Sequence, residues 1–193
     1  MGVLNDSEYQ DLAALRDDQD RHQHGWATDT CGIDLRAVDR FVQIGLCEMA
    51  DADTLLQLRP GPSQWAARLT PEGHDTLVYL PARRSNTPSP RPRHPGPEAT
   101  REVQLRPKAL EAVRLYLALE SDLRQPPAHG LDDAVHAAQR ADTGSGWLLH
   151  LTEPQVDSVA YALWLEARAH SVGPANRFAR ECGSKYKPRS RSS

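Results

Sequence analysis

The sequence contains no long hydrophobic run and little cysteine. No stretch approaches the roughly 20 apolar residues that a membrane-spanning helix needs, and residues 1–23 lack the apolar core of a signal peptide. Its three cysteines, Cys31, Cys47 and Cys182, form neither a C-x-x-C pair nor a disulfide framework, which fits a reducing compartment. We therefore expect a soluble cytoplasmic protein with no membrane partner and with inert thiols.

Motifs of catalysis are also missing. The chain has no G-x-G-x-x-G, no phosphate-binding loop, no H-E-x-x-H and no nucleophile elbow. His22 and His24 form an H-x-H pair, but no third ligand stands at helical spacing. We predict a protein that is not an enzyme and that has no cofactor and no metal site. A metal-dependent enzyme that uses His22 and His24 remains the alternative.

Lysine is scarce, and charge is unevenly distributed. Three lysines stand against twenty arginines, a bias that with abundant Ala and Asp indicates a bacterial gene of high GC content. Residues 1–80 carry a net charge of −8, whereas residues 81–193 carry +5. The positive surplus is concentrated in residues 81–109 and 177–193, where contacts with a polyanion would gather.

Proline and arginine mark a boundary between two parts. Residues 81–100 contain six prolines and four arginines without an apolar period, so we expect an extended linker there. The linker separates a domain of residues 1–80 from a helical domain with short strands, residues 101–182, and residues 183–193 should form a disordered basic tail. Arginines 83, 84, 91 and 93 are either solubilising spacers or an arm that follows DNA phosphates.

The first part should alternate helices and short strands. Thr70, Pro71 and Glu72 form a helix start, because a hydroxyl cap, a proline and an acid suit the first turn. The patterns predict helices at Ser7–Asp18 and Asp34–Ile44, strands at Thr54–Leu58 and Gln64–Leu69 around a turn at 59–63, and a helix from Pro71.

One face of the predicted helix Asp34–Ile44 is polar. Arg36, Asp39, Arg40 and Gln43 stand at positions i, i+3, i+4 and i+7, so they share one stripe opposite the apolar face. This stripe is either a solvated surface or a set of side chains that reads DNA bases. The sequence alone leaves both interpretations open.

In the second part, a short alternating stretch, a proline and a helix recur at 102–120 and 147–170, as they do around Pro71. Leu131–Arg140 suits a short helix between them, and Thr152 with Gln155 forms a capping box. The last helix carries an apolar stripe that is either an intramolecular core or a dimer interface, formed by Val156, Val159, Ala160, Leu163 and Ala167. The four tryptophans, Trp26, Trp65, Trp147 and Trp164, are predicted core anchors.

Residues 34–80 resemble the winged helix-turn-helix of MarR-type bacterial transcription regulators. The resemblance depends on "VDRFVQIGLCE" at 38–48, similar to the end of that family's recognition helix, and on "RLTPEGHDTL" at 68–77, similar to the strand that leaves the wing and the next helix cap. It implies a mainly α fold with a small β hairpin, in which a winged-helix-like N-terminal domain precedes the C-terminal helical domain.

The resemblance also implies a function and a site. The chain would be a DNA-binding transcription regulator, a homodimer on double-stranded DNA through its terminal helix, with a small-molecule effector as a further partner. The residues it assigns to DNA, together with the linker arginines, are Arg36, Arg40, Gln43, Arg59, Arg68, Arg83, Arg84, Arg91 and Arg93. The alternative is a winged-helix module that binds another protein through its acidic surface and has no DNA contact.

Overall fold

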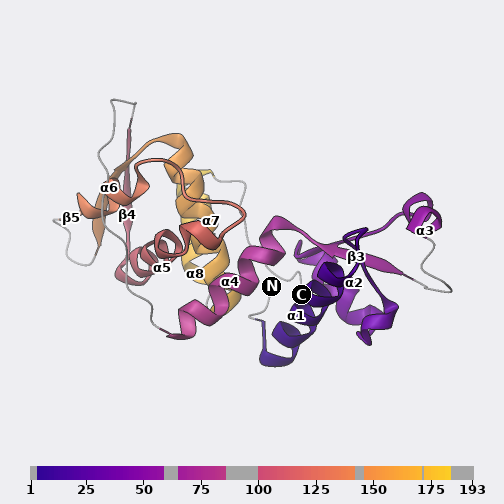
Figure 1. Ribbon diagram of the computed structural model, residues 1–193. Coiled ribbons are helices and arrows are strands. Elements are labelled where there is room, and N and C mark those ends of the chain that lie inside the picture. The colour runs from indigo at the N-terminus through magenta and orange to yellow at the C-terminus, as the bar shows by residue number, and fades with distance from the viewer. Residues whose placement is uncertain (1–3, 59–64, 86–99, 142–145, 171, 184–193) are drawn as a thin grey trace. The chain divides into compact units, whose positions relative to one another are not determined.

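The computed structural model describes residues 4–58, 65–85, 100–141, 146–170 and 172–183 (Figure 1). These residues are mainly α-helical, with two small antiparallel sheets of three strands each. The chain divides into two compact units, an N-terminal unit of Leu4–Leu77 and a C-terminal unit formed chiefly by Val78–Ser193. No helix in the described part of the chain combines the length and the hydropathy that crossing a membrane requires.

The sheet of the N-terminal unit has the order β1-β3-β2, with every neighbouring pair antiparallel. Ala27 pairs with Ala67 on one side of β3, and Cys47 pairs with Leu69 on the other. The elements in chain order are α1 (Asp6–Arg21), β1 (Ala27–Thr28), a short 3-10 helix (Asp29–Cys31), α2 (Leu35–Gln43), β2 (Cys47–Met49), α3 (Ala52–Leu58), β3 (Ala66–Leu69) and α4 (Pro71–Ser85).

The strand predicted at Thr54–Leu58 is wrong, because these residues belong to the helix α3. Asp51 caps the start of this helix, because its carboxylate accepts a hydrogen bond from the Thr54 N–H at 2.8 Å. Hydrogen bonds from Thr54 hold the pKa of the Asp51 carboxyl below its ordinary value. Figure 1 shows α3 beyond the end of β3, and none of its residues is buried. The strand that precedes β3 in the chain and pairs with it, on the side away from β1, is instead β2, which follows α2 after three residues.

The predicted helix start at Thr70 and Pro71 is confirmed, and it also holds the end of α2. The Thr70 hydroxyl accepts a hydrogen bond from the Gly73 N–H at 3.1 Å and donates to the Gly45 carbonyl at 2.8 Å. The Thr70 N–H donates to the Leu46 carbonyl at 3.0 Å. A Cβ atom on Gly73 would overlap that same carbonyl, so only glycine lets the backbone after α2 approach α4 this closely.

The C-terminal unit repeats the strand order of the first. Its sheet has the order β4-β6-β5 and is antiparallel throughout, so the third strand along the chain again lies in the middle. After the last part of α4 come β4 (Arg101–Leu105), α5 (Pro107–Ala118), a short 3-10 helix (Glu120–Asp122), α6 (Leu131–His136), β5 (Gln139–Arg140), β6 (Trp147–Leu151), α7 (Glu153–Ala169) and α8 (Val172–Cys182). The helix predicted to reach Arg140 is therefore too long, because Gln139 and Arg140 pair with β6.

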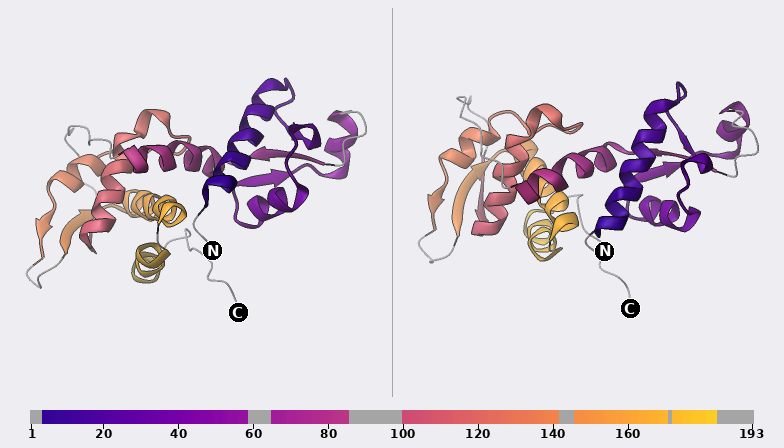
Figure 2. Two further views of the ribbon diagram at one scale, coloured as in Figure 1. Left: turned by 90° about the horizontal axis from the view of Figure 1, so that it is seen from below. Right: turned by 60° about the horizontal axis from the view of Figure 1, so that its bottom comes forward.

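The strand, proline and helix predicted three times occur at β3–α4, β4–α5 and β6–α7. At the last junction the Thr152 N–H donates to Gln155 Oε1 at 3.0 Å, as the capping box predicts. Gln155 Nε2 then donates to the His129 carbonyl at 3.0 Å, which ties the loop before α6 to the start of α7. Figure 2 shows α7 and α8 side by side, and they are in extensive contact.

Helix α4 continues to Ser85, so the first five residues of the predicted linker are helical. Glu166 on α7 fixes this end. The carboxylate accepts a hydrogen bond from the Tyr79 hydroxyl at 3.0 Å and pairs with Arg83, whose Nε lies 3.0 Å from Oε2. Burial, followed by the charge of Glu166, raises the pKa of Tyr79 far above its ordinary value, and the hydrogen bond to Glu166 raises the pKa of Arg83. Tyr79 and Glu166 are buried and Arg83 is partly buried, so the three side chains form one hydrogen-bonded group at the end of α4.

Gly73→Ala should reduce the stability of the N-terminal unit. In an unobstructed helix this change would stabilise by about 1 kcal/mol, whereas the overlap with Leu46 should instead lower the free energy of unfolding by about 1–3 kcal/mol. Urea denaturation followed by circular dichroism measures whether the free energy of unfolding falls or rises. A variant as stable as the parent would contradict the close approach.

Glu166→Ala should destabilise the C-terminal unit by about 2–3 kcal/mol, because it removes the carboxylate that pairs with Arg83 and leaves the buried Tyr79 hydroxyl only a long hydrogen bond of 3.4 Å to the Ala112 carbonyl. The matched control is Glu153→Ala on the same helix, where the carboxylate is 79% exposed and the change should cost less than about 1 kcal/mol. The midpoints of thermal unfolding compare the two variants. Equal losses for the two variants would mean that the hydrogen bonds of Glu166 to Tyr79 and Arg83 add no measurable stability.

Candidate nucleic-acid interface

Helix α2 presents the polar face that its sequence predicts. Arg36, Arg40 and Gln43 are exposed, whereas Val38 and Phe41 on the opposite side are fully buried. The carboxylate of Asp34 caps the helix through the Arg36 N–H at 2.8 Å, and the loop after the helix is held by Thr70. The observed bounds, Leu35–Gln43 with Asp34 as the cap, agree with the prediction. The polar face therefore stands on a helix that is fixed at both ends.

Charge on this face is partly neutralised by α1. Arg40 forms an ion pair with Glu8, a residue whose side chain is only 12% exposed. The other carboxylate oxygen of Glu8 accepts a hydrogen bond from the Asn5 N–H at 3.0 Å, within the capping box of α1. Because the carboxylate is held in place, Arg40 can contact phosphate or a base only by leaving a well-placed partner. Arg36 has no ion pair with any of the described residues.

Arg68 lies on the exposed side of β3. It forms an ion pair with Glu48, its cross-strand neighbour on β2, and its guanidinium carbon lies 4.5 Å from the centre of a Trp26 ring. Trp26 is only partly buried, so it is no simple core anchor, and sequence reasoning missed this contact because the two residues are 42 positions apart. Trp65, by contrast, is 4% exposed and is a core residue.

Two further predicted arginines, Arg83 and Arg84, lie in the part of α4 that belongs to the C-terminal unit. Arg83 is engaged by Glu166 in the C-terminal unit, and Arg84 follows it in the last turn of α4. Arg59, Arg91 and Arg93 lie outside the described residues. The described residues therefore place Arg36, Arg40 and Gln43 together on the exposed face of α2, whereas Arg68 lies on β3 beside Glu48 and Trp26.

The stripe predicted as a dimer interface is filled by the chain itself. Val156, Val159, Ala160, Leu163 and Ala167 are each 0–2% exposed within the C-terminal unit. Helix α7 packs there against α5 and α8, and α8 was not predicted. The intramolecular alternative is the one observed, because a second copy could reach these side chains only by opening the core.

His22 and His24 are engaged with neighbouring residues. His22 Nε2 lies 3.6 Å from the buried carboxylate of Asp18, which also accepts a hydrogen bond from the Thr28 N–H at 3.0 Å. The His24 ring stacks on His22 with centroids 4.9 Å apart. Among the described residues, no group of three or more His, Cys, Asp or Glu side chains is arranged to hold a metal ion.

The three cysteines differ in burial. Cys47 on β2 is buried and desolvation raises the pKa of its thiol to about 12, whereas Cys31 and Cys182 are partly exposed and burial raises the pKa of each by less. Only the thiolate is nucleophilic, so Cys47 is the least reactive of the three.

The rates at which the three cysteines are alkylated should follow their burial, with Cys47 the slowest. At pH 8 a thiol of pKa 12 is ionised in only about one molecule in ten thousand, so native Cys47 should resist iodoacetamide while Cys31 and Cys182 react. In concentrated urea all three should react at similar rates. Peptide mass spectrometry over a time course measures this, and rapid native labelling of Cys47 would contradict its burial.

Neither a curated protein nor a solved structure shows significant similarity to the chain. One protein family matches, over residues 49–191, which is most of the chain. The matched part begins at the end of β2 and includes the whole C-terminal unit described here, whereas α1 and α2 lie before it. The chain belongs to this family, described as a family of unknown function (DUF6417).

Proposed function

We propose that the protein binds double-stranded DNA as a bacterial transcription regulator, and that α2 of the N-terminal unit is the helix that contacts the bases. The observation that carries this proposal is the exposed face of α2. It places two arginines and a glutamine on a helix that is capped by Asp34 and held at its other end by Thr70.

The order of elements supports a winged helix. A helix, a short strand, a helical turn, a second helix and a strand follow one another from α1 to β2, and after α3 the last strand, β3, lies in the middle of the antiparallel sheet. The β2–β3 pair would be the wing, with Arg68 on it. Since β4, β5 and β6 repeat the same strand order, we infer that the C-terminal unit has the same fold.

The side chains of α2 suit base recognition. An arginine guanidinium pairs in a bidentate manner with guanine in the major groove, and a glutamine amide pairs with adenine. Arg36, Arg40 and Gln43 are separated by four and three residues, so they stand on the same face of the helix.

A second function is favoured by the ion pairs. The N-terminal region is strongly acidic, and both Arg40 and Arg68 are neutralised by carboxylates of the same unit. A surface of this kind repels phosphate and suits a basic protein partner. The homodimer is not part of either proposal, since the stripe that suggested it is buried.

The test is DNA binding at low salt by purified full-length protein and charge variants, first by gel shift against DNA upstream of the gene. Arg36→Ala and Arg40→Ala should each weaken specific binding by about 5-fold or more, whereas Arg16→Ala on α1 should not. Glu8→Gln keeps the capping box but frees Arg40, so it should strengthen binding several-fold.

The opposite outcomes are equally informative. If the wild-type protein shifts no DNA at low salt, or if Glu8→Gln leaves the affinity unchanged while Arg16→Ala lowers it, then α2 is not a DNA-reading helix. Binding of a basic protein partner that is lost on substitution of Glu8 or Glu48 would then support the second function.

A further inference from the structure

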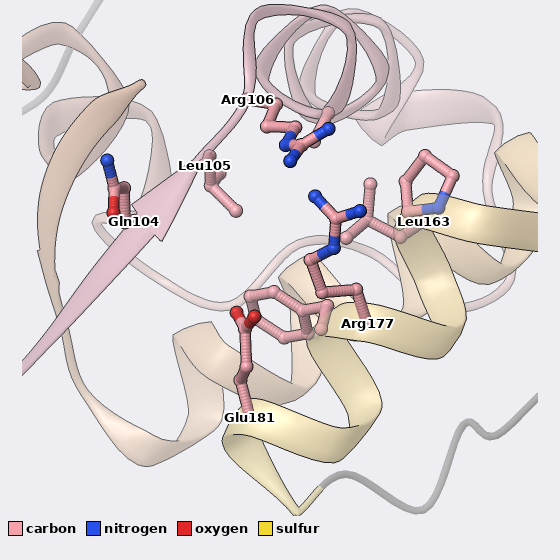
Figure 3. Close-up of a pocket in the computed structure, with 9 residues that line it drawn as sticks. Gln104, Leu105, Arg106, Leu163, Arg177 and Glu181 are labelled. Carbon is pink, nitrogen blue, oxygen red and sulfur yellow. The ribbon is translucent and has the colours of Figure 1, made fainter. Parts of the chain in front are cut away.

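A small pocket opens in the C-terminal unit where the end of β4 and the start of α5 face α7 and α8 (Figure 3). Its volume is about 40 Å³, several times what one water molecule needs. Most of its wall is apolar and comes from Leu105, Ala109, Leu163 and Phe178. Such a wall can accept a short hydrocarbon group.

Two arginines enter this apolar pocket from opposite elements. Arg106 precedes the first residue of α5 and Arg177 stands on α8, and Figure 3 shows their guanidinium groups pointing toward each other. Neither forms an ion pair with any residue that the structure describes. Glu181 also lines the pocket, but its carboxylate is not within ion-pairing distance of either guanidinium.

Arg106 is exposed and Arg177 is partly exposed, so solvent screens much of the repulsion between their like charges, and an anion between them would remove the rest. The start of α5 strengthens the preference for an anion. Arg106 is its N-cap and makes no side-chain capping hydrogen bond, in contrast to Thr70 before α4. The positive end of this 12-residue helix lies beside Arg106, at the pocket wall.

We propose that this pocket binds a small organic carboxylate. The carboxylate would lie between Arg106 and Arg177, which can each donate two hydrogen bonds to it, and a short apolar chain would lie against Leu163 and Phe178. A phosphate dianion fits less well, because the apolar wall offers it no donors and its desolvation is costly. The pocket lies entirely within residues 49–191, the part shared with the family, and the inference does not depend on DNA binding by α2.

The test is a titration of the full-length protein with butyrate, followed by NMR chemical shifts or by calorimetry. Binding should be saturable with a dissociation constant in the millimolar range or below, as expected for a ligand of few atoms. Butyrate should bind more tightly than acetate, because the longer chain buries more apolar surface. Butyramide and butylamine, which lack the carboxylate, should not bind measurably.

Three variants locate the site. Arg106→Ala and Arg177→Ala should each weaken butyrate binding by about 5-fold or more, and the matched control Arg114→Ala, an exposed arginine on α5 away from the pocket, should not. Glu181→Gln removes the acidic group among the described residues of the pocket wall, so it should strengthen binding. Circular dichroism confirms that each variant remains folded.

Several results would overturn the proposal. These are the absence of saturable butyrate binding, equal binding of acetate and butyrate or of butyrate and inorganic phosphate, and an equal loss for Arg114→Ala and Arg177→Ala. A pocket that binds butyrate in a protein that shifts no DNA would support this inference and contradict only the proposed DNA contact.

Discussion

The carbonyl oxygen of Leu46 lies where a side chain at position 73 would have to be, and much of the N-terminal unit depends on this approach. The same carbonyl accepts the Thr70 N–H, and the Thr70 hydroxyl donates to Gly45. Three contacts thus join the end of α2 to the strand-to-helix junction. Because β2 begins directly after this loop, they fix the exposed face of α2 relative to the sheet.

A corresponding junction organises the C-terminal unit with different chemistry. There Gln155 and Ser158 at the start of α7 bind the loop before α6, through the His129 carbonyl and the Ala128 N–H. Glu166, two turns further along α7, fixes the end of α4 through Tyr79 and Arg83. In each unit, therefore, the helix after the central strand is the element to which other segments attach.

The arginines at the candidate sites of the two units have different surroundings. In the N-terminal unit, Arg40 and Arg68 are paired with acids of the same unit, and this sets a cost on any contact with DNA. In the C-terminal unit, Arg106 and Arg177 line an apolar pocket wall, and neither has an acidic ion-pair partner among the described residues. The anion that we propose for the second arrangement would displace no ion pair among the described residues, whereas a DNA contact at the first requires an exchange of partners.

The sequence by itself determined the helix starts at Asp34, Pro71 and Thr152, because capping depends on residues at most four positions apart. It did not settle Thr54–Leu58, since so short an apolar run suits a strand or a helix until its cap at Asp51 is recognised. Only the tertiary structure decided that Arg83 forms an ion pair with Glu166, that Arg40 forms one with Glu8, and that the apolar stripe on α7 lies in the core. These partners are tens of residues apart, and a charge or an apolar face on one helix does not specify what will neutralise or cover it.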